Sequence, residues 1–288
     1  MMIPKTALGL AVEPNSFEGV QRTRAMPRNI LALGLLAASL LAPGAFAQTA
    51  PAGTSAPAGT PAPAADPVDA ASIQALKDMG AFLQTLKRFH VSTEATGERV
   101  LADGQKLQHV ATAEMDVARP NRLRVVIRNA QSKREIIYDG KTVTFFTPAQ
   151  KYYSTVEFSE PIGGLIDKLE QRYGVQLPLQ DLFLFGTPMA QLDKIESAMN
   201  AGQEFIDDDL CDHYAFRQGK IDWQIWISTA AGKPLPRKIV ITNRADEARP
   251  QSISVIDWNL KPTFKDSVFK FTPPAGAKKI DIVPRKTS

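Results

Sequence analysis

The sequence predicts an α+β fold: one large, curved antiparallel sheet, an unclosed β-barrel of about eleven strands, with helices covering its concave face. Two observations indicate this class. From about residue 90 to about residue 260, short segments of alternating apolar and polar character follow one another with tight connections. Stretches with helical spacing occur only at the start and in the middle of this region. A sheet this long is expected to curl, so that the helices fill or cover the resulting trough.

The first helix is expected between Val68 and Phe89. Asp69 or Ser72 can cap its start. Such an amphipathic helix needs an apolar partner surface. Its apolar stripe consists of Ile73, Leu76, Met79, Leu83 and Leu86, widened by Phe82 and Phe89.

The segment YDGKTVTFFTPAQKYYSTV, residues 138–156, is typical of paired strands, with Asp139-Gly140 as a tight turn. Alternation places Phe145 on one face of the sheet and Phe146 on the other. A sheet with apolar groups on both faces needs a cover over each face, or a cavity against one of them. In the neighbouring segment RLRVVIRN, Leu123 and Val125 share one face.

A strongly apolar insert from Ile162 to Phe185 interrupts the strands. We expect it to pack across the concave face, with Leu165, Leu169, Leu182 and Phe183 pointing inward, and to move as a lid that admits a ligand. Two short helices are expected after its main helix, in LPLQDLFLFG and PMAQLDKI. The glycines expected to give it flexibility are Gly163, Gly164, Gly174 and Gly186.

Residues 1–47 are expected to be a secretory signal peptide, with Met26 a candidate for the true start. Arg28 precedes a short apolar run, and Ala45-Phe46-Ala47 is a small-residue cleavage site. An uncleaved membrane anchor is the alternative. Residues 48–67, rich in Ala and Pro, are expected to form a disordered linker, and residues 68–288 one domain. The signal and the absence of any internal disulfide predict the periplasm.

Charge excludes one class of partner. Without its first 47 residues the chain has 30 basic and 28 acidic side chains, too even a balance for a nucleic-acid binder. The one cysteine, Cys211, excludes an internal disulfide.

The segment DDDLCDHYAF is the strongest candidate for chemistry. Cys211 and His213 lie two apart on a predicted strand and therefore share a face, where they could bind a metal or act as nucleophile and base. Asp207, Asp208 and Asp209 at the adjoining turn could bind calcium weakly. The simpler interpretation is that the aspartates form a turn and Cys211 fills the core. With no GxSxG or HExxH motif, we expect no enzyme activity, no catalytic residue, no metal and no cofactor.

A row of cations could meet anionic lipid head groups, a membrane protein or another acidic partner, or could be a solvated strand face. It consists of Arg119, Arg122, Arg124, Arg128, Lys133 and Arg134.

Trp223 and Trp226 are three residues apart, so they lie on opposite faces of one strand. One is expected in the core, and the other could touch a helix or ligand.

Five phrases in order resemble the family called domain of unknown function 2092, predicted periplasmic proteins. They are ARPNRLRVVI, YDGKTVTFFTPAQKYYSTV, DHYAFRQGKIDWQIWI, PLPRKIVIT and FKFTPPAGAKKI. That family is distantly similar to the LolA and LolB lipoprotein carriers, whose unclosed barrel and helical lid enclose an apolar cavity. The resemblance carries over no catalytic residue, and the chain lacks the lipid-anchor cysteine of LolB.

The resemblance implies a periplasmic carrier or binding protein for a lipid, an acyl chain or a lipidated protein, with peripheral membrane contact as a further expectation. The alternative is a protein-interaction module whose trough is filled by its own helices. The residues expected to line the cavity or lid are Phe82, Leu123, Val125, Phe145, Leu165, Leu169, Leu182, Phe183, Trp223 and Trp226.

Overall fold

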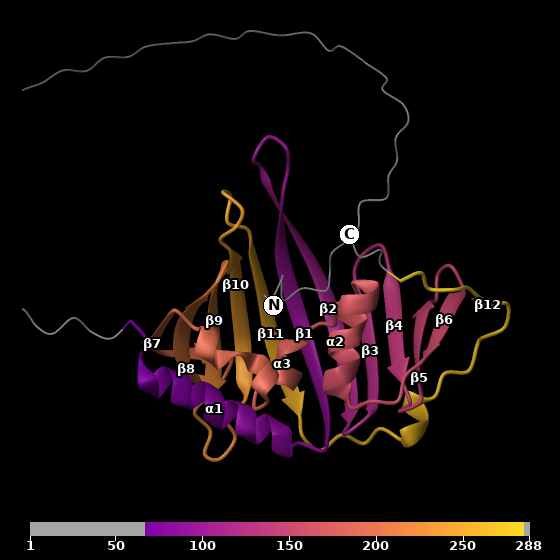
Figure 1. Cartoon of the computed structure of the whole chain (residues 1–288), viewed down its shortest axis with the longest axis horizontal. Coiled ribbons are helices and arrows are strands. Elements are labelled where there is room, and N and C mark those ends of the chain that lie inside the picture. The colour runs from indigo at the N-terminus through magenta and orange to yellow at the C-terminus, as the bar shows by residue number, and fades with distance from the viewer. Residues whose placement is uncertain (1–66, 285–288) are drawn as a thin grey trace, which may run out of the picture. The chain divides into compact units, whose positions relative to one another are not determined.

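The computed structural model describes residues 67–284, and the expected signal peptide, Met26 and most of the linker lie outside them. The described residues contain one sheet of 12 strands in the order β12-β6-β5-β4-β3-β2-β1-β11-β10-β9-β8-β7. Because β12 and β7 stand at opposite ends of this order and do not pair, the sheet is not closed into a barrel, as predicted (Figure 1).

Eleven long strands and one very short strand make up the sheet. They are β1 (Arg88–Val100), β2 (Lys106–Ala118), β3 (Arg122–Arg128), β4 (Lys133–Tyr138), β5 (Thr142–Thr147), β6 (Tyr152–Glu157), β7 (Ser197–Ile206), β8 (Asp209–Gln218), β9 (Ile221–Ser228), β10 (Pro236–Asn243), β11 (Gln251–Asn259) and β12 (Lys278–Lys279). Neighbouring long strands are antiparallel, and β12 pairs with β6 in parallel. The α+β class is therefore confirmed, with the strands close to where alternation predicts them.

The helical elements are α1 (Ala70–Thr85), α2 (Ile162–Tyr173), α3 (Asp181–Leu184) and the 3-10 turns η1 (Pro188–Ala190), η2 (Leu192–Lys194) and η3 (Asp266–Phe269). Asp69 caps α1, since its carboxylate accepts hydrogen bonds from the amides of Ala71 and Ser72. The helix ends earlier than predicted, because the backbone is extended at Leu86 and Phe89 belongs to β1. PMAQLDKI forms two 3-10 turns instead of a helix, because Gln191 between them is left-handed with φ 48°.

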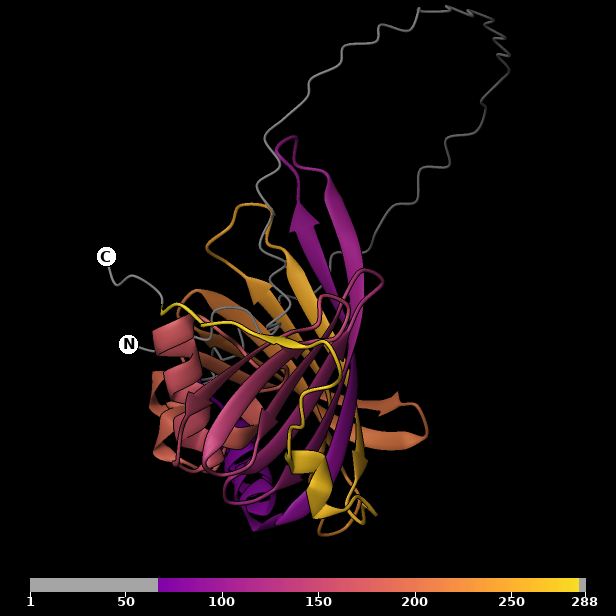
Figure 2. The ribbon, with the colours of Figure 1, turned by 90° about the vertical axis from the view of Figure 1, so that its right-hand side faces the viewer.

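The curled sheet presents its concave face to the helices (Figures 1 and 2). Alternate residues of the strands point there and join α1, α2 and α3 in one buried apolar cluster, which we call the concave core. α2 crosses in front of β2 and β3, and α1 lies along one end of the trough (Figure 1). The concave core includes Val91, Met115, Val125, Tyr138, Ile225 and Ile256 from six strands.

The outer face carries its own cover. Phe145 packs against the concave core, whereas Phe146 on the other face lies 5.3 Å, between ring centroids, from Phe271 of the C-terminal segment. Asp266 of η3 bonds Arg88 and Arg122 there, and Phe269 is buried. The C-terminal segment is thus the second cover that the paired phenylalanines require.

Candidate functional site

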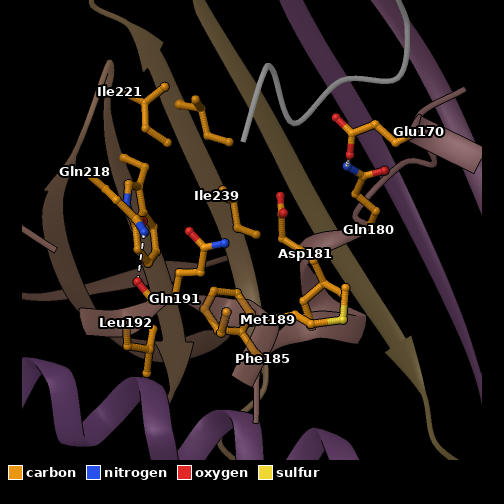
Figure 3. A pocket seen from close by; sticks show the side chains of 14 residues that line it. Glu170, Gln180, Asp181, Phe185, Met189, Gln191, Leu192, Gln218, Ile221 and Ile239 are labelled. Carbon is orange, nitrogen blue, oxygen red and sulfur yellow. Dashed lines mark hydrogen bonds between the residues drawn. The ribbon is translucent and has the colours of Figure 1, made fainter. Parts of the chain in front are cut away.

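The site is a pocket between the inner face of β9 and β10 and the segment that runs from α3 to η2. Its sheet wall is apolar and its opposite wall mixes apolar and polar groups (Figure 3). The sheet wall consists of Ile221, Trp223, Ile239 and Ile241. The apolar part of the opposite wall consists of Leu184, Phe185, Met189, Ala190 and Leu192.

The sheet wall follows from strand alternation. Ile221 and Trp223 are two apart on β9, Ile239 and Ile241 are two apart on β10, and Trp223 is paired with Ile241 across the ladder. Trp223 also stacks on Phe216 of β8 at 4.3 Å between ring centroids. Its indole Nε1 is buried and has no hydrogen-bond partner among the described residues. These contacts hold a large flat side chain at the base of the pocket.

Close packing on α1 positions the opposite wall. A Cβ atom on Gly80 of α1 would lie 2.4 Å from the backbone nitrogen of Gly186, so only glycine allows this approach. The Gln84 side chain donates hydrogen bonds to the carbonyl oxygens of Phe183 (3.3 Å) and Phe185 (2.7 Å). Gly186, expected to give the insert flexibility, is a point of close contact with α1. Gly174 is the left-handed cap of α2.

A polar corner closes one side of the pocket. Glu170 of α2 accepts hydrogen bonds from the side-chain amides of Gln176 at 3.0 Å and Gln180 at 3.4 Å. Asp181 has no side-chain donor for its carboxylate among the described residues, and Figure 3 shows it on the same side of the pocket as Glu170 and Gln180. Burial, and then the negative charge of Glu170, raises the pKa of Asp181 to about 6.

The size of the pocket limits what it can hold. The space free of protein atoms is about 810 Å³ when the part open to solvent is included. The cavity proper measures only about 90 Å³. A cavity that binds a drug-sized ligand is commonly about 300–1,000 Å³. In this conformation the pocket therefore accepts a small apolar group, and a longer chain requires the opposite wall to move.

Of the ten residues predicted to line a cavity, Trp223 lines this pocket. Leu182 and Phe183 lie at a smaller second pocket beside Leu83 and Arg119. The Arg119 guanidinium lies 5.6 Å from the centre of the Phe183 ring, and burial lowers the pKa of Arg119. This second pocket has room for little more than one water-sized molecule, with about 10 Å³ for its centre.

Five other predicted residues belong to the closed part of the concave core. Leu123, Val125, Leu165 and Leu169 are at most 1% exposed, and Phe145 packs against the same cluster. The inward packing predicted for Leu165, Leu169, Leu182 and Phe183 is therefore confirmed. That this segment moves stays a prediction.

The structure places the last two predicted residues away from the pocket. Trp226 belongs to a separate cluster with Ile206, Cys211 and Val240, which we call the outer cluster. Trp226 is one residue out of phase with the pocket-lining Trp223, so it faces the convex side. Phe82 is half-buried on α1 and is not part of the concave core.

Sequence reasoning missed the other residues of the site. Alternation in PRKIVITN signals that Ile239 and Ile241 share a face, and an acid inside the apolar stretch LPLQDLFLFG signals Asp181. Neither pattern shows that these residues meet Glu170 and Met189, because that juxtaposition depends on how the segment from residue 174 to 194 folds back over the sheet.

Cys211 and His213 lie on one face of β8, as predicted, and that face is the outer one. Cys211 is fully buried, and burial raises the pKa of its thiol to about 11. His213 stacks on Trp226 at 4.0 Å between ring centroids, and its Nε2 lies 2.9 Å from the side-chain oxygen of Gln224. No group of three or more His, Cys, Asp or Glu side chains that could hold a metal ion occurs among residues 67–284.

The cationic row on the outer face is largely paired with acids. Arg122 bonds Asp266 (2.6 Å), Arg124 bonds Glu135 (3.0 Å) and Arg128 bonds Glu114 (2.8 Å). Lys133 also pairs with Glu135. This arrangement favours the interpretation of a solvated strand face over that of an anion-binding surface.

Within the described residues, no helix has the length and apolarity to cross a membrane.

Comparison with solved structures found several similar chains at low identity. LprF from Mycobacterium bovis is 13% identical, with a TM-score of 0.40 over 73% of this chain and 99% of that chain. The lipoprotein LppX of Mycobacterium tuberculosis is 11% identical, with a TM-score of 0.37 over 68% and 98%. A LolA superfamily protein from Nitrosomonas europaea is 11% identical, with a TM-score of 0.36 over 69% and 97%.

No curated protein that was compared matches the chain. A family model does match, over residues 72–283, which is nearly the whole described domain. Its description is "Predicted periplasmic protein (DUF2092)", and the phrases that suggest this family in the sequence lie within or beside the matched range. The chain belongs to the DUF2092 family of predicted periplasmic proteins.

Proposed function

We propose that the protein is a periplasmic binding or carrier protein that holds a hydrophobic ligand, such as a lipid or an acyl chain, free or attached to a protein, between the sheet and its helical cover. One observation carries the proposal. The trough is filled almost everywhere by the concave core, yet an apolar pocket open to solvent remains between β9, β10 and the α3–η2 segment. Apolar pockets with a few polar groups are the usual form of a small-molecule site. The proposed role needs no catalytic group.

Ligand entry is proposed to displace the opposite wall of the pocket, at η1 and η2, rather than α2. The buried side chains of α2 are at most 1% exposed, whereas η1 and η2 contain no buried residue. Displacing η1 and η2 therefore exposes less apolar surface to water than displacing α2. A ligand that covers Trp223 and Ile239 in their place would shift the population toward the open form.

Mass spectrometry of organic extracts tests the proposal with the protein purified from its own periplasm. The expected result is a co-purifying lipid or acyl species. Uptake is then measured with the neutral fluorescent probe N-phenyl-1-naphthylamine and the delipidated protein. Ala190→Phe, which fills the pocket, should reduce probe binding at least about tenfold, equivalent to about 1.4 kcal/mol. Ala102→Phe, on an exposed turn, is the matched control. Equal probe binding by both variants, together with lipid-free extracts, would refute the proposal.

The proposed localisation has its own test. Terminal sequencing of the secreted form should find Gln48 as the first residue, because Ala45-Phe46-Ala47 satisfies the small-residue cleavage rule. A chain that starts before Met26 and fractionates with membranes would contradict it.

One observation favours the alternative of a protein-interaction module. Strand β7 ends the sheet, and its residues 199–205 are exposed, with Met199 and Phe205 54% and 69% accessible. An extended peptide can add to such an edge. Phe205→Lys should then abolish capture of a protein partner and leave probe binding intact, whereas Ala190→Phe should do the reverse.

A further inference from the structure

The charges of the pocket restrict the ligand class, and this step rests on the proposed function. Two of the lining residues are ionisable, Glu170 and Asp181, and both are acids. None of the described lining residues is a lysine, arginine or histidine. Neither acid forms an ion pair within the part of the chain that the structure describes. Among residues 67–284, the pocket therefore presents negative charge with no compensating cation.

Three acids of the outer face differ from this pair, because each has a cationic partner. Glu135 lies between Arg124 and Lys133, Asp222 bonds Arg217, and Asp266 bonds two arginines. Within the described residues, Glu170 is bonded by the neutral side-chain amides of Gln176 and Gln180, and Asp181 by its own backbone amide alone. Partly buried charges without a partner are costly, so these two would gain most from an incoming cation.

We propose that the pocket selects an amphiphile whose polar end is a cationic amine, with its apolar chain against Trp223 and Ile239 and its amine beside Glu170 and Asp181. A carboxylate or phosphate head would be placed beside like charge in a poorly solvated corner, which opposes binding. The chain without its first 47 residues has a small excess of basic groups, so its overall charge would favour anions. A preference for amines must therefore come from the pocket itself.

The two carboxylates also predict how selectivity depends on pH. Among the described residues, the charge that perturbs Asp181 is that of Glu170 on α2. Arg119 lies over the ring of Phe183 on α3 and forms no ion pair with either acid there. Since the pKa of Asp181 is raised to about 6, its negative charge develops between about pH 5 and pH 7. An alkyl ammonium ion keeps its charge over this range, because its pKa is close to the lysine value of about 10.4.

Displacement of bound N-phenyl-1-naphthylamine tests the proposal, with dodecylamine, dodecan-1-ol and dodecanoate below their micelle concentrations. At about pH 7.5 the amine should displace the probe at a concentration at least about tenfold below that of dodecanoate, with the alcohol between them. The amine's advantage should shrink at about pH 5. Asp181→Asn and Glu170→Gln should each reduce it, while Glu247→Gln, an exposed acid elsewhere, should not.

The outcomes separate this inference from the proposed function. If dodecanoate displaces the probe as well as the amine does, or if the preference survives in both pocket variants, the inference is wrong while hydrophobic binding stands. If the probe does not bind to wild-type protein at all, both are wrong. Asp181→Asn keeps the side-chain shape and removes an unpaired charge, so it is expected to fold; circular dichroism checks this before titration.

Discussion

The trough under α2 and the trough under the α3–η2 segment are lined by the same kind of sheet surface, yet one is closed and the other holds a pocket. Under α2, twelve helical residues bury four apolar side chains at regular spacing, each at most 1% exposed. Under the second segment, a four-residue helix and two 3-10 turns leave Met189, Ala190 and Leu192 half-buried. The regularity of the covering element, rather than the sheet, decides whether the trough is filled.

The irregularity has an identifiable backbone cause. Leu179 and Gln191 have φ angles of 52° and 48°, a left-handed conformation that non-glycine residues adopt at some cost. Leu179 lies just before α3 and Gln191 separates η1 from η2, so the segment does not form one continuous helix with an apolar stripe. The same breaks bring Asp181 to the edge of the pocket beside Glu170 (Figure 3).

The comparison predicts the largest loss of stability under α2. Leu165→Ala should lower the free energy of unfolding by about 2–5 kcal/mol, because it leaves a cavity in a closed core. Leu192→Ala, a half-buried leucine on the pocket wall, should cost about 1 kcal/mol or less. Urea denaturation of both variants measures the difference. Equal losses would show that the two halves are packed alike.

Two glycines on helices sharpen the contrast between close contact and open space. Gly80→Ala should lower the free energy of unfolding by about 1–3 kcal/mol, because the added methyl group meets the Gly186 backbone. Gly163→Ala on α2 meets nothing within 4 Å and should raise it by about 0.5–1 kcal/mol through helix propensity. Thermal unfolding should move in opposite directions. If Gly80→Ala left the free energy of unfolding unchanged, the opposite wall of the pocket would not be held on α1.

Asp181→Asn should stabilise the protein in a pH-dependent way. The pKa of Asp181 is raised from 3.8 to about 6, so its ionised form is disfavoured in the folded state. The wild-type protein therefore loses stability from this group as pH rises through about 4 to 6, and the loss is complete above that range. The variant should be more stable by on the order of 1–2 kcal/mol at about pH 7.5 and close to wild type at about pH 4. Denaturation curves at the two pH values test the sign.

The smallest functional effect is expected outside the trough. Cys211→Ser should leave metal content and probe binding at wild-type levels, because Cys211 packs in the outer cluster on the opposite face from the pocket. The wild-type thiol should react with iodoacetamide only after unfolding, since it is buried and its pKa is raised to about 11. Stoichiometric zinc that is lost on substitution would overturn this interpretation.

The sequence by itself determined the strands, their faces and the two main helices. Period-two alternation is local, so it assigned Leu123 and Val125 to one face and separated Phe145 from Phe146 without knowledge of the fold. Helical spacing in the insert likewise identified Leu165 and Leu169 as inward-facing. These assignments hold because each depends only on residues close together in the chain.

Only the tertiary structure decided where space remains. Their spacing places Trp223 and Trp226 on opposite faces of β9, but only the structure shows that Trp223 lines the pocket and that Trp226 packs on the outer face. The corner formed by Glu170 and Asp181 requires α2 and α3 to fold back against each other, and the sheet wall opposite it comes from strands about fifty residues further along the chain. Whether a side chain borders a pocket depends on how completely distant elements fill the volume around it, and no local pattern records that.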